Sequence, residues 1–82
     1  MARYHFNLMD GQPHEDVDGH ELPTIDHAKR EAVRHMGQLL ITQPKQFWSG
    51  ETWTLEVTCE GKGAIFEVQF SANMIIPEEW VI

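Results

Sequence analysis

The sequence has few cysteines, few basic residues and no long hydrophobic run. Cys59 is the only cysteine among 82 residues, so an internal disulfide is excluded and a cysteine-based zinc site is not expected. No apolar run exceeds a few residues, far short of the ~20 that cross a bilayer. The N-terminal residues also lack a basic stretch followed by an apolar one, which predicts a cytoplasmic location and no membrane partner.

Positive charge is scarce as well. Six lysines and arginines stand against 13 acidic residues, which gives a formal net charge of −7. This balance opposes binding to nucleic acid and to anionic lipid, because both require clustered cations. Five histidines are many for this length. If all five titrate near pH ~6.5, the charge rises to about −2 near pH 5.

An amphipathic helix is predicted over residues 25–42. Thr24 is placed to cap its free amides, Asp26 favours the positive end of its dipole, and Pro44 ends it. At 100° per residue, one side collects the apolar positions. The residues expected on this buried side are Ile25, Ala28, Ala32, Val33, Met36, Leu39 and Leu40.

Alternating patterns predict three strands, over residues 3–9, 52–59 and 64–70. The last two form a hairpin closed by the glycine-containing turn 60–63. Residues 14–22 are expected to form a short edge strand or an ordered loop, with a bend at Gly19. Phe47 and Trp48, in the loop after the helix, are expected to fold back onto the core.

These elements predict an α+β fold with two layers. An antiparallel sheet of three or four strands is expected to carry one helix packed on one face. Residues 1–70 form a single domain, and residues 71–82 form an apolar tail. The tail is expected to pack on the domain, where it would cover Ile41, or to lie at a dimer or partner interface.

The order and spacing of four short motifs resemble a known family. The motifs are Arg3-Tyr4-His5-Phe6-Asn7-Leu8 with Asp10-Gly11, Asp16-x-x-Gly19-x-Glu21-Leu22-Pro23, Ala28-x-x-Glu31-Ala32, and Trp53-x-Leu55-Glu56-Val57 with a hairpin ending at Phe70. Over roughly residues 2–70 the chain is similar to small, mostly alphaproteobacterial proteins grouped as domain of unknown function 6894. The resemblance implies a cytoplasmic bacterial protein and supplies no catalytic residues.

The histidines suggest a metal- or pH-responsive site. His27, Glu31 and His35 recur every fourth residue along one flank of the helix. The outer two histidines would stand about 12 Å apart at 1.5 Å rise per residue, too far for one ion. A zinc site would therefore combine one of them with Glu31 and a loop histidine; the candidate ligands are His14, His20, His27 and Glu31. The alternative is a solvated polar face.

Two other kinds of site have little support. His14-x-Asp16-x-Asp18-Gly19 resembles the start of a calcium loop, but its twelfth position is Ile25 instead of a bidentate glutamate. Catalysis requires a nucleophile, a base and an orienting group in one pocket. Cys59 is predicted to face inward, and Ser49 and Ser71 lie in loops without a motif. No enzyme activity and no cofactor are expected.

A non-enzymatic module for protein interaction or self-association is the favoured function, with an unknown protein or a second copy as partner. One candidate surface is the sheet face away from the helix, which is otherwise a solvated face. The other is the apolar tail. The candidate residues on the two surfaces are His5, Thr54, Glu56, Ile75, Ile76, Trp80, Val81 and Ile82.

Overall fold

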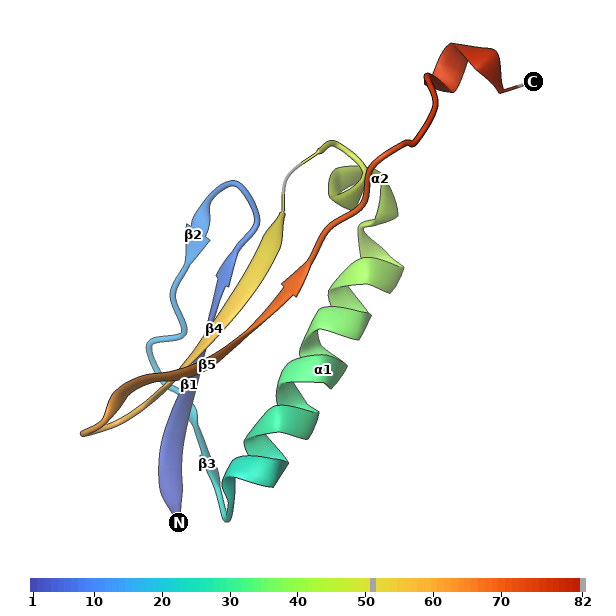
Figure 1. Ribbon diagram of the computed structural model, residues 1–82. Coiled ribbons are helices and arrows are strands. Elements are labelled where there is room, and N and C mark those ends of the chain that lie inside the picture. Colours follow the sequence, from blue (N-terminus) through green and yellow to red (C-terminus); the bar gives the residue numbers. More distant parts are fainter. Residues whose placement is uncertain (51, 82) are drawn as a thin grey trace.

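The computed structural model describes residues 1–50 and 52–81. Its elements form an antiparallel sheet with one long helix, so the α+β class is confirmed (Figure 1). In chain order they are β1 (Ala2–Met9), β2 (Pro13–His14), β3 (His20–Leu22), α1 (Ile25–Thr42), α2 (Pro44–Phe47), β4 (Trp53–Cys59), β5 (Gly63–Phe70) and the 3-10 helix η1 (Glu78–Trp80).

The sheet has five strands instead of the predicted three or four. Its main order is β2-β1-β4-β5, and β3 also pairs with β1. Both short strands come from the stretch predicted as one edge strand or a loop. They pair with opposite ends of β1, with His14 opposite Leu8 and His20 opposite Tyr4. Between them Gly19 takes a positive φ of 73°, which redirects the chain.

Helix α1 begins and ends as predicted. The Thr24 hydroxyl accepts a hydrogen bond from the His27 N–H at 3.3 Å, which confirms the cap. Ala28, Ala32 and Met36 are fully buried, while Leu39 and Leu40 are half-buried.

Two residues of the predicted buried side are exposed. Ile25 is 45% exposed and Val33 57% exposed. The stripe that packs on the sheet is therefore narrower than the sequence pattern predicts, and Val33 lies on the uncovered flank of α1.

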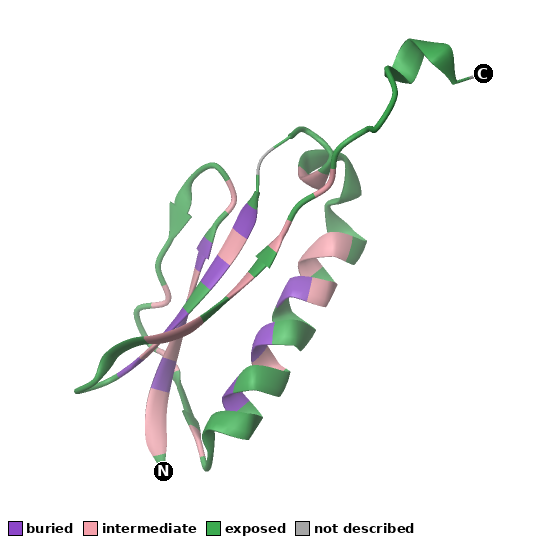
Figure 2. Cartoon of the chain, in the orientation of Figure 1, coloured by how far each residue is buried: buried purple, intermediate pink, exposed green. Residues whose placement is uncertain are grey.

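The core lies between α1 and the strands, where buried positions alternate along β1 and β4 (Figure 2). Trp53, Leu55 and Val57 have no solvent exposure, and Cys59 is buried as predicted. Phe47 packs its ring edge-on to Trp53, with centroids 5.3 Å apart. Trp48 is 56% exposed, so the prediction that both rings fold back holds for Phe47 and is wrong for Trp48.

The segment after Phe70 leaves the domain as an extended arm that ends in η1 (Figure 1). Ile41 is 78% exposed. The tail therefore does not cover Ile41, as it would if it packed on the domain in the way that the first of the two predicted placements describes. No helix within residues 1–50 and 52–81 has the length and apolar character needed to cross a membrane.

Candidate functional site

The open face of the sheet carries a row of polar side chains across three strands. Asn7 of β1 lies opposite Glu56 of β4, which lies opposite Glu67 of β5. Glu56, the neighbouring Thr54 and Glu67 line a hollow of about 410 Å³ on this face. Like charges on directly opposed residues are unfavourable, so a partner that brings a basic side chain to this row would be stabilised there.

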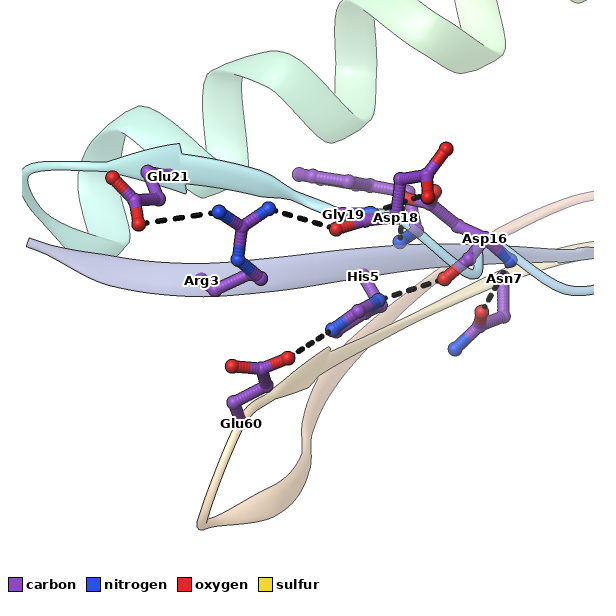
Figure 3. A network of polar contacts seen from close by, with 9 residues as sticks. Arg3, His5, Asn7, Asp16, Asp18, Gly19, Glu21 and Glu60 are labelled. Carbon is purple, nitrogen blue, oxygen red and sulfur yellow. Dashed lines mark hydrogen bonds and ion pairs between the residues drawn. The ribbon is translucent and has the colours of Figure 1, made fainter.

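A polar network fastens the loop between β2 and β3 to β1 (Figure 3). The Asp16 carboxylate accepts hydrogen bonds from the N–H of Phe6 at 3.1 Å and from the N–H of Gly19 at 3.0 Å. The Asn7 side-chain oxygen accepts from the N–H of Asp16 at 2.9 Å. Asp16, which sequence reasoning considered only as a calcium ligand, is therefore an anchor of the loop.

Arg3 adds a second fastening nearer the start of β1. Its guanidinium donates to the backbone oxygen of Asp18 at 2.8 Å and to the Glu21 carboxylate at 3.2 Å. This role of Arg3 was not predicted from the sequence. The spacing Asp16-x-x-Gly19 was the only local signal, because an aspartate often accepts from an N–H a few residues ahead in a turn.

His5, a predicted site residue, lies within this network rather than free on the sheet face. Its Nδ1 is 2.7 Å from the backbone oxygen of Asp16, and its Nε2 is 3.3 Å from Glu60 Oε1 (Figure 3). Both neighbours are acceptors, so both contacts are hydrogen bonds at the same time only when the imidazole is protonated.

The electrostatic environment favours charge on both His5 and Asp16. The hydrogen bond to the Asp16 oxygen raises the pKa of His5; burial opposes this, and the contact with Glu60 adds to it. Burial of the Asp16 carboxyl acts to raise its pKa. The hydrogen bonds from Phe6 and Gly19 outweigh burial, and the pKa of Asp16 is lowered.

Replacing His5 with glutamine is expected to remove a stability contribution that depends on pH. Because the folded pKa of His5 lies above the unfolded value, its contribution is fully present below pH ~6.5 and is lost as pH rises through the folded pKa. The free energy of unfolding from urea titrations should therefore separate wild type from His5→Gln more at pH 5.5 than at pH 8.5. His35→Gln, at an exposed helix position, is the control; an equal gap at both pH values would contradict the assignment.

The predicted zinc ligands lie at different places. His14 Nε2 is 3.0 Å from Asp10 Oδ1, His27 Nδ1 is 2.7 Å from the Thr24 hydroxyl, and the His20 ring lies edge-on to Phe6. No group of three or more His, Cys, Asp or Glu residues is arranged to hold a metal ion within the described ranges 1–50 and 52–81.

Glu31 is held by a residue of its own helix. Its carboxylate accepts hydrogen bonds from the Arg34 guanidinium, and this contact lowers the pKa of Glu31. Burial acts against the shift, while His20 and His35 add to it through their positive charge when protonated.

Three histidines line one hollow beside α1. His14, His20 and His35 line a hollow of about 390 Å³, together with Asp10 and Asp16. His35 takes the place that the sequence analysis gave to His27. His35, four residues after Glu31, reaches this hollow, whereas His27, four residues before Glu31, lies at the helix start beside Thr24.

The C-terminal tail presents apolar side chains without cover. Ile75 is 96% exposed and Trp80 69% exposed. Ile76 and Val81 are about as open as Met74, and Ile82 lies outside the described residues. Met74 and Glu78 share a surface hollow with the exposed Trp48, so this end of the molecule gathers apolar groups from both the tail and the loop after α1.

The comparisons with known proteins identify a family but no similar curated protein or solved structure. Residues 3–71 match the family described as a domain of unknown function, DUF6894. Since the match covers most of the chain, the protein belongs to this family. No curated protein and no solved structure matched. The matched residues end at 71, so nearly all of the exposed tail lies outside the family domain.

Proposed function

We propose that this protein is a non-enzymatic module that associates with proteins, in the first place with a second copy of itself, through its C-terminal tail. The observation that carries the proposal is the exposure of the tail: Met74, Ile75, Ile76, Trp80 and Val81 are each roughly half or more exposed. Apolar groups gathered in this way are typical of interaction sites. Trp is also among the residues that contribute most to binding energy at interfaces.

The absence of an activity is part of this proposal and rests on the candidate nucleophiles. Cys59 is buried, and the Ser49 hydroxyl donates to the backbone oxygen of Gln46. Neither is positioned with a base beside a pocket. The proposal keeps the predicted cytoplasmic location and the expectation of no nucleic-acid partner; a lone thiol and a net charge of −7 support them.

Association should be lost when the tail is made polar while the domain remains folded. Ile75→Ser combined with Trp80→Ser is expected to raise the dissociation constant by at least about 30-fold, since a central tryptophan contributes ~2 kcal/mol or more. Sedimentation equilibrium measures the association, and circular dichroism checks the fold. Deleting residues 72–82 should have the same result.

The control is Val17→Ser, which removes a 77% exposed apolar side chain from the loop between β2 and β3. It should leave association unchanged. Wild-type protein that remains monomeric at high concentration would count against self-association. Unfolding after the deletion of residues 72–82 would show that the tail belongs to the core.

A small pH- or metal-responsive protein is the second candidate. The favouring observation is the hollow lined by His14, His20 and His35 with two aspartates. The pH form does not depend on this hollow; it rests on the contacts of His5 with Asp16 and Glu60, and the His5→Gln profile described above tests it. The metal form is tested by calorimetric titration of the wild-type chain with Zn²⁺: binding that disappears in His14→Ala and His20→Ala supports it, and no heat of binding removes it.

A further inference from the structure

The outer edge of β5 is the one long sheet edge that nothing pairs with in the part of the chain that the structure describes. The sheet order ends at β5, which pairs only with β4. On the other side of the sheet β1 is covered in pieces by β2 and β3. Free edges are usually protected by lysine, proline, several charges or a bulge. Within β5 the only charged residue is Glu67, and there is no proline.

One of these protective features, a bulge, is present in β5, and it limits how much of the strand edge is free to pair. The register between β4 and β5 shifts between Val57 and Thr58, so that Ile65 is the extra residue of a bulge. From Phe66 to Phe70 the ladder is regular. The free edge is therefore a regular segment of five residues with Val68 at its centre.

The apolar side chains of this segment are incompletely covered. Phe66, Val68 and Phe70 are half-buried, whereas their partners on β4, namely Val57, Leu55 and Trp53, have no exposure. Helix α1 thus covers β4 more fully than β5. Val33 lies roughly 160° around α1 from His35. Since His35 faces the loop beside β1, Val33 lies on the flank toward β5, and it is 57% exposed.

We propose that the free edge of β5 pairs antiparallel with the β5 of a second copy, about a two-fold axis that passes through Val68. This inference rests on the proposed function as a self-associating module and adds a second surface to it, next to the tail that follows β5 directly. The pairing places Val68 opposite Val68 of the second copy, Phe66 opposite Phe70, and Glu67 opposite Gln69. It uses the whole regular segment and no residue of the bulge.

The alternative registers are less favourable for stated reasons. An axis at Glu67 would place two carboxylates directly opposite each other, which is destabilising. An axis at Phe66 would bring Ile65, the bulged residue, into the ladder, where its backbone is out of register. Only the axis at Val68 makes the five-residue segment complementary to itself, as an isologous interface requires. That symmetry favours a second copy over an unrelated peptide.

The same axis would also cover the half-exposed side chains. Two five-stranded sheets would become one continuous sheet with both helices on the same face. Neighbouring strands lie ~4.8 Å apart, so the two β4 strands would be about 14 Å apart with both β5 strands between them. Phe66, Val68 and Phe70 of each copy would then fill the space between the two helices, where Val33 also lies.

Cysteine cross-linking of the full-length chain tests the register. In Val68→Cys the two thiols would belong to directly opposed residues, whose Cα atoms lie ~4.5–5.5 Å apart in antiparallel pairs, within disulfide range. Mild oxidation should convert most of the protein to a covalent dimer. In Ala64→Cys, four residues from the axis, the two thiols would not be opposed, so the covalent dimer should stay at the wild-type level, which is low because Cys59 is buried.

A second pair of variants avoids the half-buried position. Glu67 and Gln69 are both exposed. Neither Glu67→Cys nor Gln69→Cys should cross-link alone, whereas an equal mixture of the two should form the mixed covalent dimer. Two results would overturn the β5 pairing and leave the tail as the interface. The first is cross-linking of Glu67→Cys alone and of Gln69→Cys alone. The second is a chain that sedimentation shows to be dimeric but that cross-links neither in the mixture nor as Val68→Cys. A monomeric wild type without cross-linking would overturn both the pairing and self-association.

Discussion

Gly19→Ala is expected to cost the domain roughly 2–4 kcal/mol of folding free energy, because two effects add. The residue has a φ of +73°, in the region that L-residues adopt at a cost of ~1–2 kcal/mol. An added Cβ would also lie 2.8 Å from the Tyr4 backbone oxygen and 2.9 Å from His5 Cε1. The backbone of β1 is fixed in the sheet, so the loop would have to move. Urea unfolding followed by circular dichroism measures the loss.

Gly61→Ala is the matched control, since it separates the cost of a side chain at positive φ from the cost of a steric clash with β1. Gly61 has a φ of +82° at the tip of the β4–β5 hairpin, and an added Cβ would meet nothing within 4 Å. Alanine there should cost only about 1 kcal/mol. Equal losses in the two variants would show that the close approach of Gly19 to β1 does not contribute to stability.

The same variant tests whether the loop network sets the charge of His5. The collision involves the His5 ring itself, so movement of the loop would separate Nδ1 from the Asp16 oxygen, now at 2.7 Å. Histidine titration by NMR should then show a lower pKa for His5 in Gly19→Ala than in wild type. The Gly61→Ala chain should titrate as wild type does.

The parts of the fold that the sequence predicted are those governed by local periodicity. The bounds of α1, its Thr24 cap and the inward positions of β4 agree with the structure because each depends on a few neighbouring residues. The strand count was wrong because β2 and β3 are only two and three residues long. Such short strands exist through pairing with β1, and a sequence pattern does not record a partner.

The site was predicted less well, for a related reason. Val33 and Trp48 are apolar but exposed, and only the position of α1 over the sheet decides this. The role of Asp16 arises from hydrogen bonds to Phe6 and Asn7, which are ten and nine residues away in sequence. The tail residues were chosen for being apolar, and their exposure is a property of the whole molecule. The sequence shows which residues are apolar, but it does not show whether another part of the molecule covers them.

Trp53→Ala is expected to have an even larger effect, a loss of ~3–5 kcal/mol, because it empties the largest fully buried site of the core. Trp53 has no exposure, and the Phe47 ring packs edge-on against it. Its removal would therefore loosen α2 as well as β4. For a domain of this size, whose stability is typically near the lower end of ~5–15 kcal/mol, the variant should be close to unfolding at 25 °C. Circular dichroism is the suitable probe, since the substitution removes a fluorophore.

Trp53→Phe is the informative companion, because the indole N–H of Trp53 is buried without a hydrogen-bond partner among the described residues. An unpaired buried donor costs about 1–3 kcal/mol. Phenylalanine keeps an aromatic ring against Phe47 but fills less volume, which destabilises the core. Removing the unpaired N–H donor partly offsets this cost, so the net loss of folding free energy should stay below about 1.5 kcal/mol. A phenylalanine variant as unstable as the alanine variant would show that the indole N–H is satisfied in solution. The core would then contain a polar contact at Trp53, beside the ring of Phe47.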